Sequence, residues 1–135
     1  MSNTVSQARI LLADDHPGAL AQAASRLRED YEVVGMVANG LDLLDAALRL
    51  NPDVIVLDIS MPGLNGFEAA QRLKEAGSRS RLVFLTVWED SDFAREAMAV
   101  GADAYVVKSR LASDLNLAVS EVLAEHKFLS PPLTI

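Results

Sequence analysis

The sequence has no cysteine, only two histidines and few aromatic residues, which make up 5% of its 135 residues. Without cysteine, disulfide bonds, thiolate catalysis and cysteine metal sites are excluded. No apolar run approaches the roughly 20 residues that a membrane-spanning helix needs. The first residues, MSNT, lack the basic and apolar segments of a signal peptide. These absences predict a soluble, cytoplasmic protein with no membrane partner.

Basic residues are outnumbered, since 12 Lys and Arg stand against 19 Asp and Glu, which leaves a formal charge of -7. Nucleic-acid phosphates require Lys and Arg, so this charge argues against direct, nonspecific binding to DNA or RNA. Half of the residues are hydrophobic, and the mean hydropathy is +0.19. A chain of this length and composition fits one domain with a well-buried core.

Strand-like apolar runs alternate with segments whose apolar residues recur at helical spacing. The predicted strands are residues 10–13, 32–37, 54–57, 82–85 and 104–107. Asn51-Pro52 and Gly77 are typical of helix ends. About five β-α units in series predict an α/β fold with a doubly wound parallel sheet and helices on both faces.

The end of the chain departs from this alternation, because Pro131 and Pro132 interrupt it. We therefore predict one domain over residues 1–128. Residues 129–135 are expected to be a frayed tail or the start of a linker.

Polar residues follow four of the predicted strands, and the carboxyl ends of parallel strands meet at one edge of a sheet. These residues are Asp14, Asp15, Asp58, Thr86 and Lys108. Two carboxylates about 4 Å apart repel by roughly 4 kcal/mol at an effective dielectric constant of about 20, so such a cluster needs protons or a cation. Oxygen ligands without His or Cys favour Mg²⁺. A simpler alternative for Asp14 or Asp15 is a cap on the following helix.

Four sequence segments together resemble the receiver domain of bacterial two-component response regulators. They are LLADDHP at residues 11–17, PDVIVLDISMPGLNG at 52–66, Thr86, and YVVK at 105–108. The resemblance covers residues 8–128. It implies a five-stranded flavodoxin-like (βα)5 receiver fold with strand order 2-1-3-4-5. The pieces ADDH, KS and FLSP further resemble receivers that precede a LuxR-like helix-turn-helix domain.

The resemblance also implies a chemistry. Asp58 would be the phosphoacceptor, taking a phosphoryl group from a phosphohistidine of a sensor histidine kinase. Asp15 and Asp58 would bind Mg²⁺ directly, together with the backbone carbonyl of Ser60, and Asp14 would hold a metal-bound water. A carboxylate nucleophile needs no general base at neutral pH, so no catalytic histidine is required.

Three further residues receive roles from the same resemblance. Lys108 would neutralise a phosphoryl oxygen, Thr86 would move inward to bond another, and Tyr105 would follow Thr86 as an aromatic switch. The expected partners are the kinase, a second receiver after phosphorylation, and DNA only through an output domain that is not in this chain. The expected output is transcription regulation. Apart from self-catalysed phosphoryl transfer and autodephosphorylation, no enzyme activity is expected.

Several residues have a simpler interpretation than the role that the resemblance implies, and one departs from the family's usual sequence. His16 is expected to be a polar residue that opens a helix, and Tyr105 could be an ordinary half-exposed strand residue. Trp88 is expected to be a surface loop aromatic, with shielding of the phosphoryl group as the alternative. Ser109 stands where many receivers have proline, so no cis peptide bond is expected after Lys108.

Other functions remain open for the same residues. One is a stand-alone, single-domain response regulator, and another is a phosphorylation-independent interaction domain. An aspartyl-phosphate phosphohydrolase usually needs an acid two residues after its nucleophile, where this chain has Ser60. A flavin- or nucleotide-binding module is disfavoured because no Gly-rich phosphate loop follows the first strand.

Overall fold

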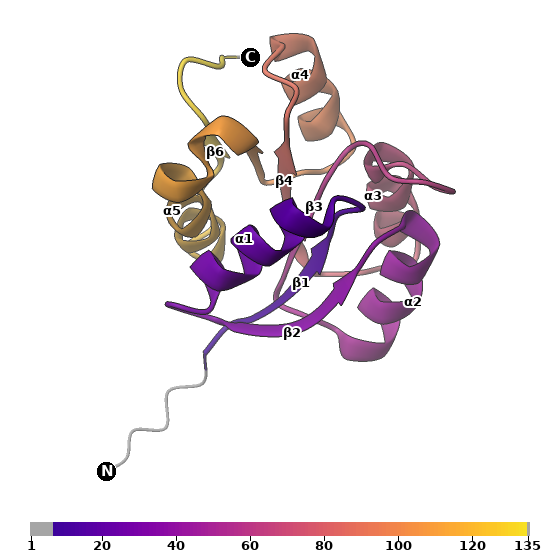
Figure 1. Cartoon of the computed structure of the whole chain (residues 1–135). Coiled ribbons are helices and arrows are strands. Elements are labelled where there is room, and N and C mark those ends of the chain that lie inside the picture. Colours follow the sequence, from indigo (N-terminus) through magenta and orange to yellow (C-terminus); the bar gives the residue numbers. More distant parts are fainter. Residues whose placement is uncertain (1–6, 135) are drawn as a thin grey trace.

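The computed structural model describes residues 7–134, in which strands and helices alternate (Figure 1). The strands are β1 Arg9–Ala13, β2 Glu32–Val37, β3 Val54–Leu57, β4 Arg81–Thr86, β5 Ala104–Val107 and β6 Phe128–Leu129. The helices are α1 Pro17–Leu27, α2 Gly40–Leu50, α3 Gly66–Glu75, α4 Ser91–Ala99 and α5 Leu111–Leu123, with a 3-10 turn, η1, at Lys108–Arg110. Residues 1–6 and Ile135, at the ends of the predicted domain and tail, lie outside the described residues.

The strands form one parallel sheet in the order β2-β1-β3-β4-β5-β6. The predicted α/β fold and the predicted order of the first five strands are therefore confirmed. The sheet has helices on both faces, with α1 and α5 on one and α2 and α3 on the other (Figure 1). Parallel sheets of this kind are buried on both sides, which explains the nearly continuous apolar strands.

Alternate residues of the central strands belong to different cores. In β1, Leu11 and Ala13 face the core formed with α2, α3 and α4, whereas Ile10 and Leu12 face the core formed with α1 and α5. Successive side chains of a strand point to opposite faces, so one short run serves both cores. This burial holds the strand ends in place and thereby positions the polar residues that follow them.

The predicted helix ends have clear local causes. The side chain of Asn39 accepts the backbone N–H of Asp42 at 2.8 Å and caps the start of α2. Asn51, in the left-handed conformation, follows the last residue of α2. Gly77 follows Ala76, the C-cap residue of α3, with a φ of +81°. Glycine adopts that conformation without the steric cost that a side chain brings, so its place after the helix is explained.

The end of the described chain differs from the expectation of five strands followed by a tail. Phe128 and Leu129 form a sixth strand beside β5, with Tyr105 opposite Leu129. Ser130 is fully buried. Residues 128–130 are thus packed against the sheet. The prolines at 131 and 132, which break the sequence pattern, come only after them.

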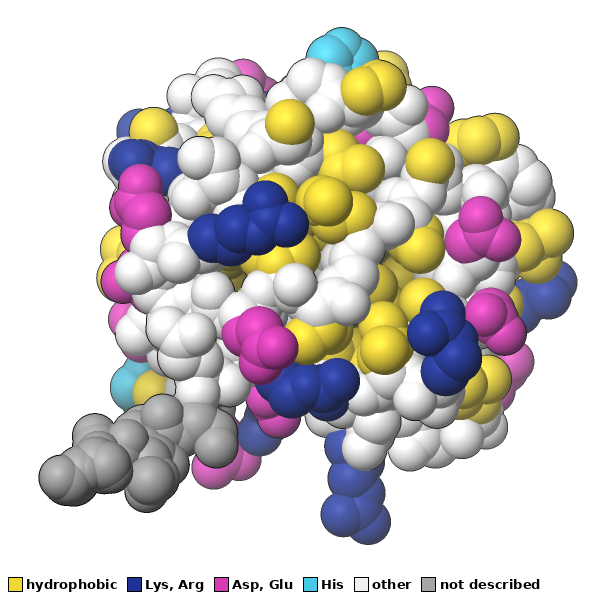
Figure 2. Space-filling view, turned by 60° about the horizontal axis from the view of Figure 1, so that its bottom comes forward, with side chains coloured by type: hydrophobic (Ala, Val, Ile, Leu, Met, Phe, Trp, Pro, Cys, Tyr) yellow, Lys and Arg dark blue, Asp and Glu magenta, His cyan; other side chains and the backbone are white. Residues whose placement is uncertain are grey.

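The surface carries both signs of charge. On the face in Figure 2, Lys and Arg side chains alternate with Asp and Glu around hydrophobic atoms, and no unbroken basic surface is visible. This agrees with the net charge of -7 and gives no support to direct binding of nucleic acid on this face. Within residues 7–134, no helix has the length and apolar character needed to cross a bilayer.

Candidate functional site

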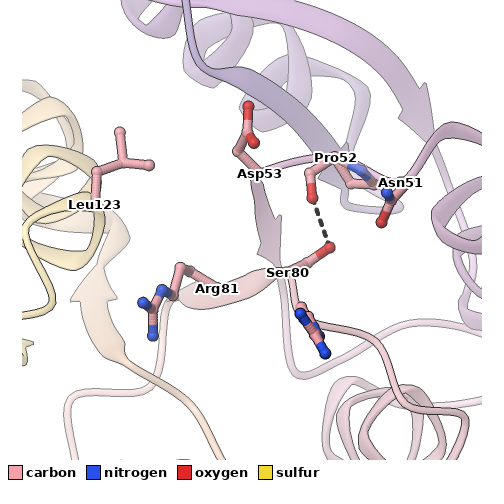
Figure 3. A pocket seen from close by; sticks show the side chains of 7 residues that line it. Asn51, Pro52, Asp53, Ser80, Arg81 and Leu123 are labelled. Carbon is pink, nitrogen blue, oxygen red and sulfur yellow. Dashed lines mark hydrogen bonds between the residues drawn. The ribbon is translucent and has the colours of Figure 1, made fainter.

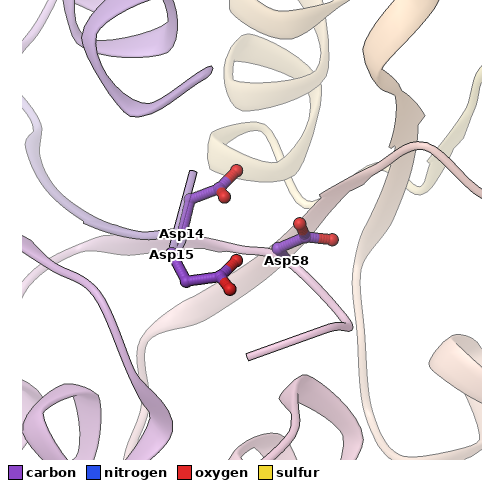
Figure 4. Close-up of side chains that lie close together, drawn as sticks. All are labelled: Asp14, Asp15 and Asp58. Atoms are coloured by element: carbon purple, nitrogen blue, oxygen red, sulfur yellow. The ribbon is translucent and has the colours of Figure 1, made fainter. Parts of the chain in front are cut away.

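Three carboxylates converge at the ends of β1 and β3 (Figure 4). Each of Asp14, Asp15 and Asp58 offers an oxygen that lies within 4.8 Å of the others. The cause is the parallel register, in which Ala13 pairs with Leu57 and accepts the backbone N–H of Asp58 at 3.0 Å. Asp14 and Asp58 are each 5% exposed, whereas Asp15 is exposed. The sheet thus brings together the three acids that the sequence singled out.

The cap of α1 is His16, whose Nδ1 accepts the backbone N–H of Ala19 at 3.0 Å. Neither Asp14 nor Asp15 has this role, so the helix-cap alternative does not account for them. Asp14 instead accepts the backbone N–H of His16 at 2.9 Å, which shapes the turn into the helix. The expectation that His16 opens the helix is confirmed.

Lys108 reaches into the acid cluster from the end of β5. Its Nζ lies 2.7 Å from Asp14 Oδ2 and 2.9 Å from Asp58 Oδ2. Burial would lower the pKa of Lys108, but the hydrogen bonds and charges of Asp14 and Asp58 prevail and raise it above its ordinary value. The lysine is therefore held charged between two carboxylates. The bond from Lys108 to Asp14 was not anticipated from the sequence.

The two oxygens of Asp58 have different partners. Oδ1 accepts the backbone N–H of Ile59 at 2.7 Å, and Oδ2 accepts Lys108. The loop that follows closes tightly, because Gly66 donates its N–H to the carbonyl of Ile59 at 2.7 Å. A Cβ at Gly66 would lie 2.1 Å from the carbonyl oxygen of Asp58. Only glycine allows this approach, which fixes the backbone on which Asp58 stands.

Thr86 and Tyr105 lie on neighbouring strands and are both fully buried. The hydroxyl of Tyr105 donates to the carbonyl of Trp88 at 2.6 Å. Burial, with added repulsion from Asp58 and Asp90, raises the pKa of Tyr105 well above its ordinary value. Tyr105 is therefore a buried and neutral residue rather than a half-exposed strand aromatic. The sequence alone left this point open, since type and spacing do not report burial.

Trp88 is 43% exposed, which fits the expected loop aromatic, but its position is defined by contacts. Its ring stacks on Phe93 of α4, with centroids 5.1 Å apart. Its Nε1–H donates to Oγ of Ser60 at 3.3 Å, across 28 positions of sequence. Trp88 thus joins the loops after β3 and β4 beside the acid cluster.

The donor set fits a hard divalent cation. Asp14, Asp15 and Asp58 supply carboxylate oxygens only, and no His or Cys belongs to the cluster that the described residues form. Mg²⁺ prefers such ligands and retains several waters. Ser60 is exposed and follows Ile59 in the loop after Asp58, and the role of its backbone carbonyl stays a prediction.

A prominent cavity lies near the amino-terminal ends of β3 and β4, away from the acid cluster at their carboxyl ends (Figure 3). It measures about 340 Å³ and is lined by Asn51, Pro52, Asp53, Arg79, Ser80, Arg81 and Leu123. Asp53 precedes β3 and Arg81 begins β4, so this cavity is separated from the acid cluster by the length of the strands. It is not part of the candidate site.

The backbone after Lys108 has the expected geometry. The cis peptide bond found in residues 7–134 joins Pro131 to Pro132, so the bond from Lys108 to Ser109 is trans. This agrees with serine in place of the proline found in many receivers.

Comparison with known proteins gives a consistent result. The family model described as the response regulator receiver domain matches residues 10–120. The chain is 37% identical to the nitrate/nitrite response regulator protein NarL of Escherichia coli, covering 99% of this chain and 62% of NarL. It is 32% identical to the transcriptional regulatory protein DesR of Bacillus subtilis, covering 92% of this chain and 62% of DesR. The chain thus spans about three fifths of the length of these relatives.

A solved structure shows the same fold. The two-component response regulator of the LuxR family from Aurantimonas superposes with a TM-score of 0.86 at 33% identity. The match covers 93% of this chain and 91% of that one.

Proposed function

Since this chain belongs to the family of response regulator receiver domains, we propose that Asp58 accepts a phosphoryl group from the phosphohistidine of a sensor kinase. The observation that carries the proposal is the placement of the Asp58 carboxylate 2.9 Å from Lys108 Nζ and beside Asp14 and Asp15. A carboxylate oxygen of Asp58 bonds to phosphorus while the bond from phosphorus to the imidazole nitrogen breaks. That nitrogen keeps the electron pair.

Asp14, Asp15, Asp58 and the carbonyl of Ser60 would hold Mg²⁺, directly or through water. When bound, the ion supplies charge neutralisation for the phosphoryl oxygens, the main requirement of a loose phosphoryl-transfer transition state. Lys108 supplies a second positive charge from the other side, on a side chain that is only 15% exposed. Its bonds to Asp14 and Asp58 support this role.

Thr86 and Tyr105 would report the phosphorylated state. Thr86 ends β4 and is followed by the segment of Trp88, whose carbonyl accepts the hydroxyl of Tyr105. A Thr86 hydroxyl that turns to the phosphoryl group pulls on this segment, and Tyr105 follows through its hydrogen bond. The receiver thereby acts as a phosphorylation-dependent switch. Apart from the loss of its own phosphoryl group, it would catalyse no reaction of an external substrate.

The output would be transcription regulation in the cytoplasm, through a DNA-binding domain outside this chain. NarL is named a response regulator and DesR a transcriptional regulatory protein, and each is longer than this chain. A stand-alone switch is the alternative output. The expected partners are the sensor kinase and, after phosphorylation, a second receiver.

The test is to incubate the protein with acetyl phosphate or phosphoramidate and to weigh it intact. We expect one added phosphoryl group, dependent on Mg²⁺ and absent in Asp58→Ala. The matched control is Asp45→Asn, which removes an exposed acid of α2 and should be labelled as the wild type is. A phosphorylated species that persists in Asp58→Ala would refute the assignment. Continuous hydrolysis of phosphate esters, instead of single labelling, would indicate a phosphohydrolase.

A further inference from the structure

The segment after α5 returns to the sheet and covers the edge of β5. Phe128 donates its N–H to the carbonyl of Asp103 at 3.2 Å, and Ser130 donates to the carbonyl of Tyr105 at 2.9 Å. Leu129 and Leu133 pack against the core on the α4 side, and Phe128 packs against the core on the α5 side. We call residues 128–134 the strap. It fills the edge between the two helices that flank β5.

A buried polar cluster fastens the strap at Ser130, which is fully buried. Its Oγ donates to Asp114 Oδ2 at 2.7 Å and accepts the backbone N–H of Val107 at 3.2 Å. Asp114 is 3% exposed and also accepts Arg110 Nε at 2.8 Å and Ser113 Oγ at 3.0 Å. A buried carboxylate is stable only with such partners, so these contacts are a specific attachment rather than a surface contact. We call the hydrogen-bonded group of Arg110, Ser113, Asp114 and Ser130 the lock.

The lock is one turn of chain away from the candidate site. Lys108 and Arg110 are the two ends of the 3-10 turn η1. Lys108 is bonded to Asp58, while Arg110 is bonded to Asp114, which in turn holds Ser130. The same short turn therefore touches the phosphoacceptor at one end and the strap lock at the other.

A second connection runs through β5 itself. The hydroxyl of Tyr105 is bonded to Trp88 beside the site, and the carbonyl of Tyr105 is bonded to Ser130 of the strap. Val107, whose N–H is bonded to Ser130, directly precedes Lys108. Tyr105 and Val107, the residue before Lys108, are thus joined to the strap through hydrogen bonds.

We propose that the strap is the receiver's own output element and that phosphorylation of Asp58 tightens its attachment to β5. This inference rests on the proposed function. A phosphoryl group bonded to both Thr86 and Lys108 links the end of β4 to the end of β5. This link makes local separation of β5 from the rest of the sheet less frequent. Since the strap is held by β5 and η1, its own opening becomes rarer. A partner that reads this face meets α4, the strap and α5, rather than a bare edge of β5.

The test is amide hydrogen exchange of the chain with Mg²⁺, measured with and without beryllofluoride, which mimics the acyl phosphate. We expect exchange at the N–H groups of Ser130 and Leu133, which donate to Tyr105 and to Ser130, to slow by about fivefold or more, the lower end of typical allosteric coupling. Trp88 fluorescence reports beryllofluoride binding independently, since the chain has one tryptophan, beside the site.

Variants separate coupling from simple packing. Ser130→Ala removes the hydroxyl that joins Val107 to Asp114 while leaving the phosphoacceptor intact. The ratio of strap exchange rates with and without beryllofluoride should fall toward one in this variant, and Asp58 should still be phosphorylated. Ser25→Ala, on the exposed face of α1, is the matched control and should keep the wild-type ratio.

The outcomes are distinct. Bound beryllofluoride with unchanged or faster strap exchange in the wild type overturns the proposed coupling and leaves the proposed function standing. Absence of both beryllofluoride binding and phosphorylated mass overturns both. An unchanged ratio in a folded Ser130→Ala variant shows that the lock does not transmit the signal. The wild-type measurement decides the question even if Ser130→Ala fails to fold.

Discussion

The indole Nε1 of Trp88 lies 3.3 Å from Oγ of Ser60, which joins the loop after β4 to the loop that follows Asp58. The stacking of Trp88 on Phe93 fixes the other side of the ring. A large aromatic side chain therefore spans two loops at the rim of the acid cluster. We expect a ring in this place to limit the approach of water to Asp58.

Removal of this ring is expected to shorten the life of the phosphorylated state. In Trp88→Ala, water reaches the acyl phosphate more easily, and we expect hydrolysis to accelerate by up to about tenfold, or roughly 1.4 kcal/mol in the barrier. The measurement is the decay of phosphorylated mass after removal of the phosphodonor.

Two variants separate the ring from its hydrogen bond. Trp88→Phe keeps an aromatic ring against Phe93, and Ser60→Ala removes only the acceptor of Nε1, so both should stay within about threefold of the wild type. A decay rate in Trp88→Ala equal to that of the wild type would show that the ring does not protect the phosphoryl group.

Binding of Mg²⁺ should depend more on Asp15 than on Asp14. Asp14 is already engaged by Lys108 and by the N–H of His16, and its proposed link to the ion is through water. Loss of a direct ligand is costlier than loss of a water-mediated one. Titration followed by Trp88 fluorescence should show weaker binding in Asp15→Ala than in Asp14→Ala. Glu75→Gln, an exposed acid of α3, is the control, and equal affinity in Asp15→Ala and the wild type contradicts the assignment.

The pairing of Lys108 with Asp14 and Asp58 leads to a prediction on stability. Lys108→Met leaves two buried carboxylates without their cation, and we expect the free energy of unfolding to fall by about 1–3 kcal/mol in EDTA, allowing for partial solvent screening. Mg²⁺ should restore the loss, because the ion replaces the missing charge. Thermal unfolding with and without Mg²⁺ measures this, and a smaller stabilisation by Mg²⁺ in the variant than in the wild type would contradict it.

Most of the fold was predictable because the apolar runs of β1, β3 and β4 are buried on both faces, which leaves a strong signal in the sequence. The strand β6 was not predicted. It has only two residues, and it forms because the edge of β5 and the buried Asp114 are available to it. Such a strand depends on tertiary contacts, which local sequence patterns do not report.

The acids of the site could be predicted from the sequence, whereas the contacts between its loops could not. Asp14 and Asp58 come together because parallel strands end at one edge, a rule that needs no side-chain detail. The bond from Trp88 to Ser60 depends on the paths of two loops, and the choice of His16 as a cap depends on local backbone angles. The sequence indicated only that His16 opens the helix, and it gave no sign of the bond from Trp88 to Ser60.

Phosphorylation should not produce a tight dimer of this chain by itself. The net charge of -7 opposes self-association, and the edge of β5 is already covered by β6 in the described structure. We expect a monomer that associates weakly at most. Sedimentation with and without beryllofluoride checks this. A tight dimer that is indifferent to beryllofluoride would show that assembly is constitutive and that the switch acts elsewhere.

The lock around Asp114 gives the protein a specific response to acid. Burial would raise the pKa of Asp114, but the bonds from Arg110, Ser130 and Ser113 prevail and lower it below its ordinary value of 3.8. A carboxylate with a lowered pKa in the folded state contributes stability above about pH 4, and this contribution is lost as the pH falls through the lowered pKa.

Asp114→Asn should therefore be less stable than the wild type at pH 7, by about 1–3 kcal/mol for hydrogen bonds to a charged group. The difference should shrink below about pH 4, since the wild-type carboxylate then becomes protonated while the amide does not change. Urea unfolding between about pH 7 and pH 3 measures both curves. Asp45→Asn removes one negative charge from the surface of α2 and corrects for the change in net charge. A difference between wild type and Asp114→Asn that grows on acidification would mean that Asp114 is not held as a charged group by Arg110.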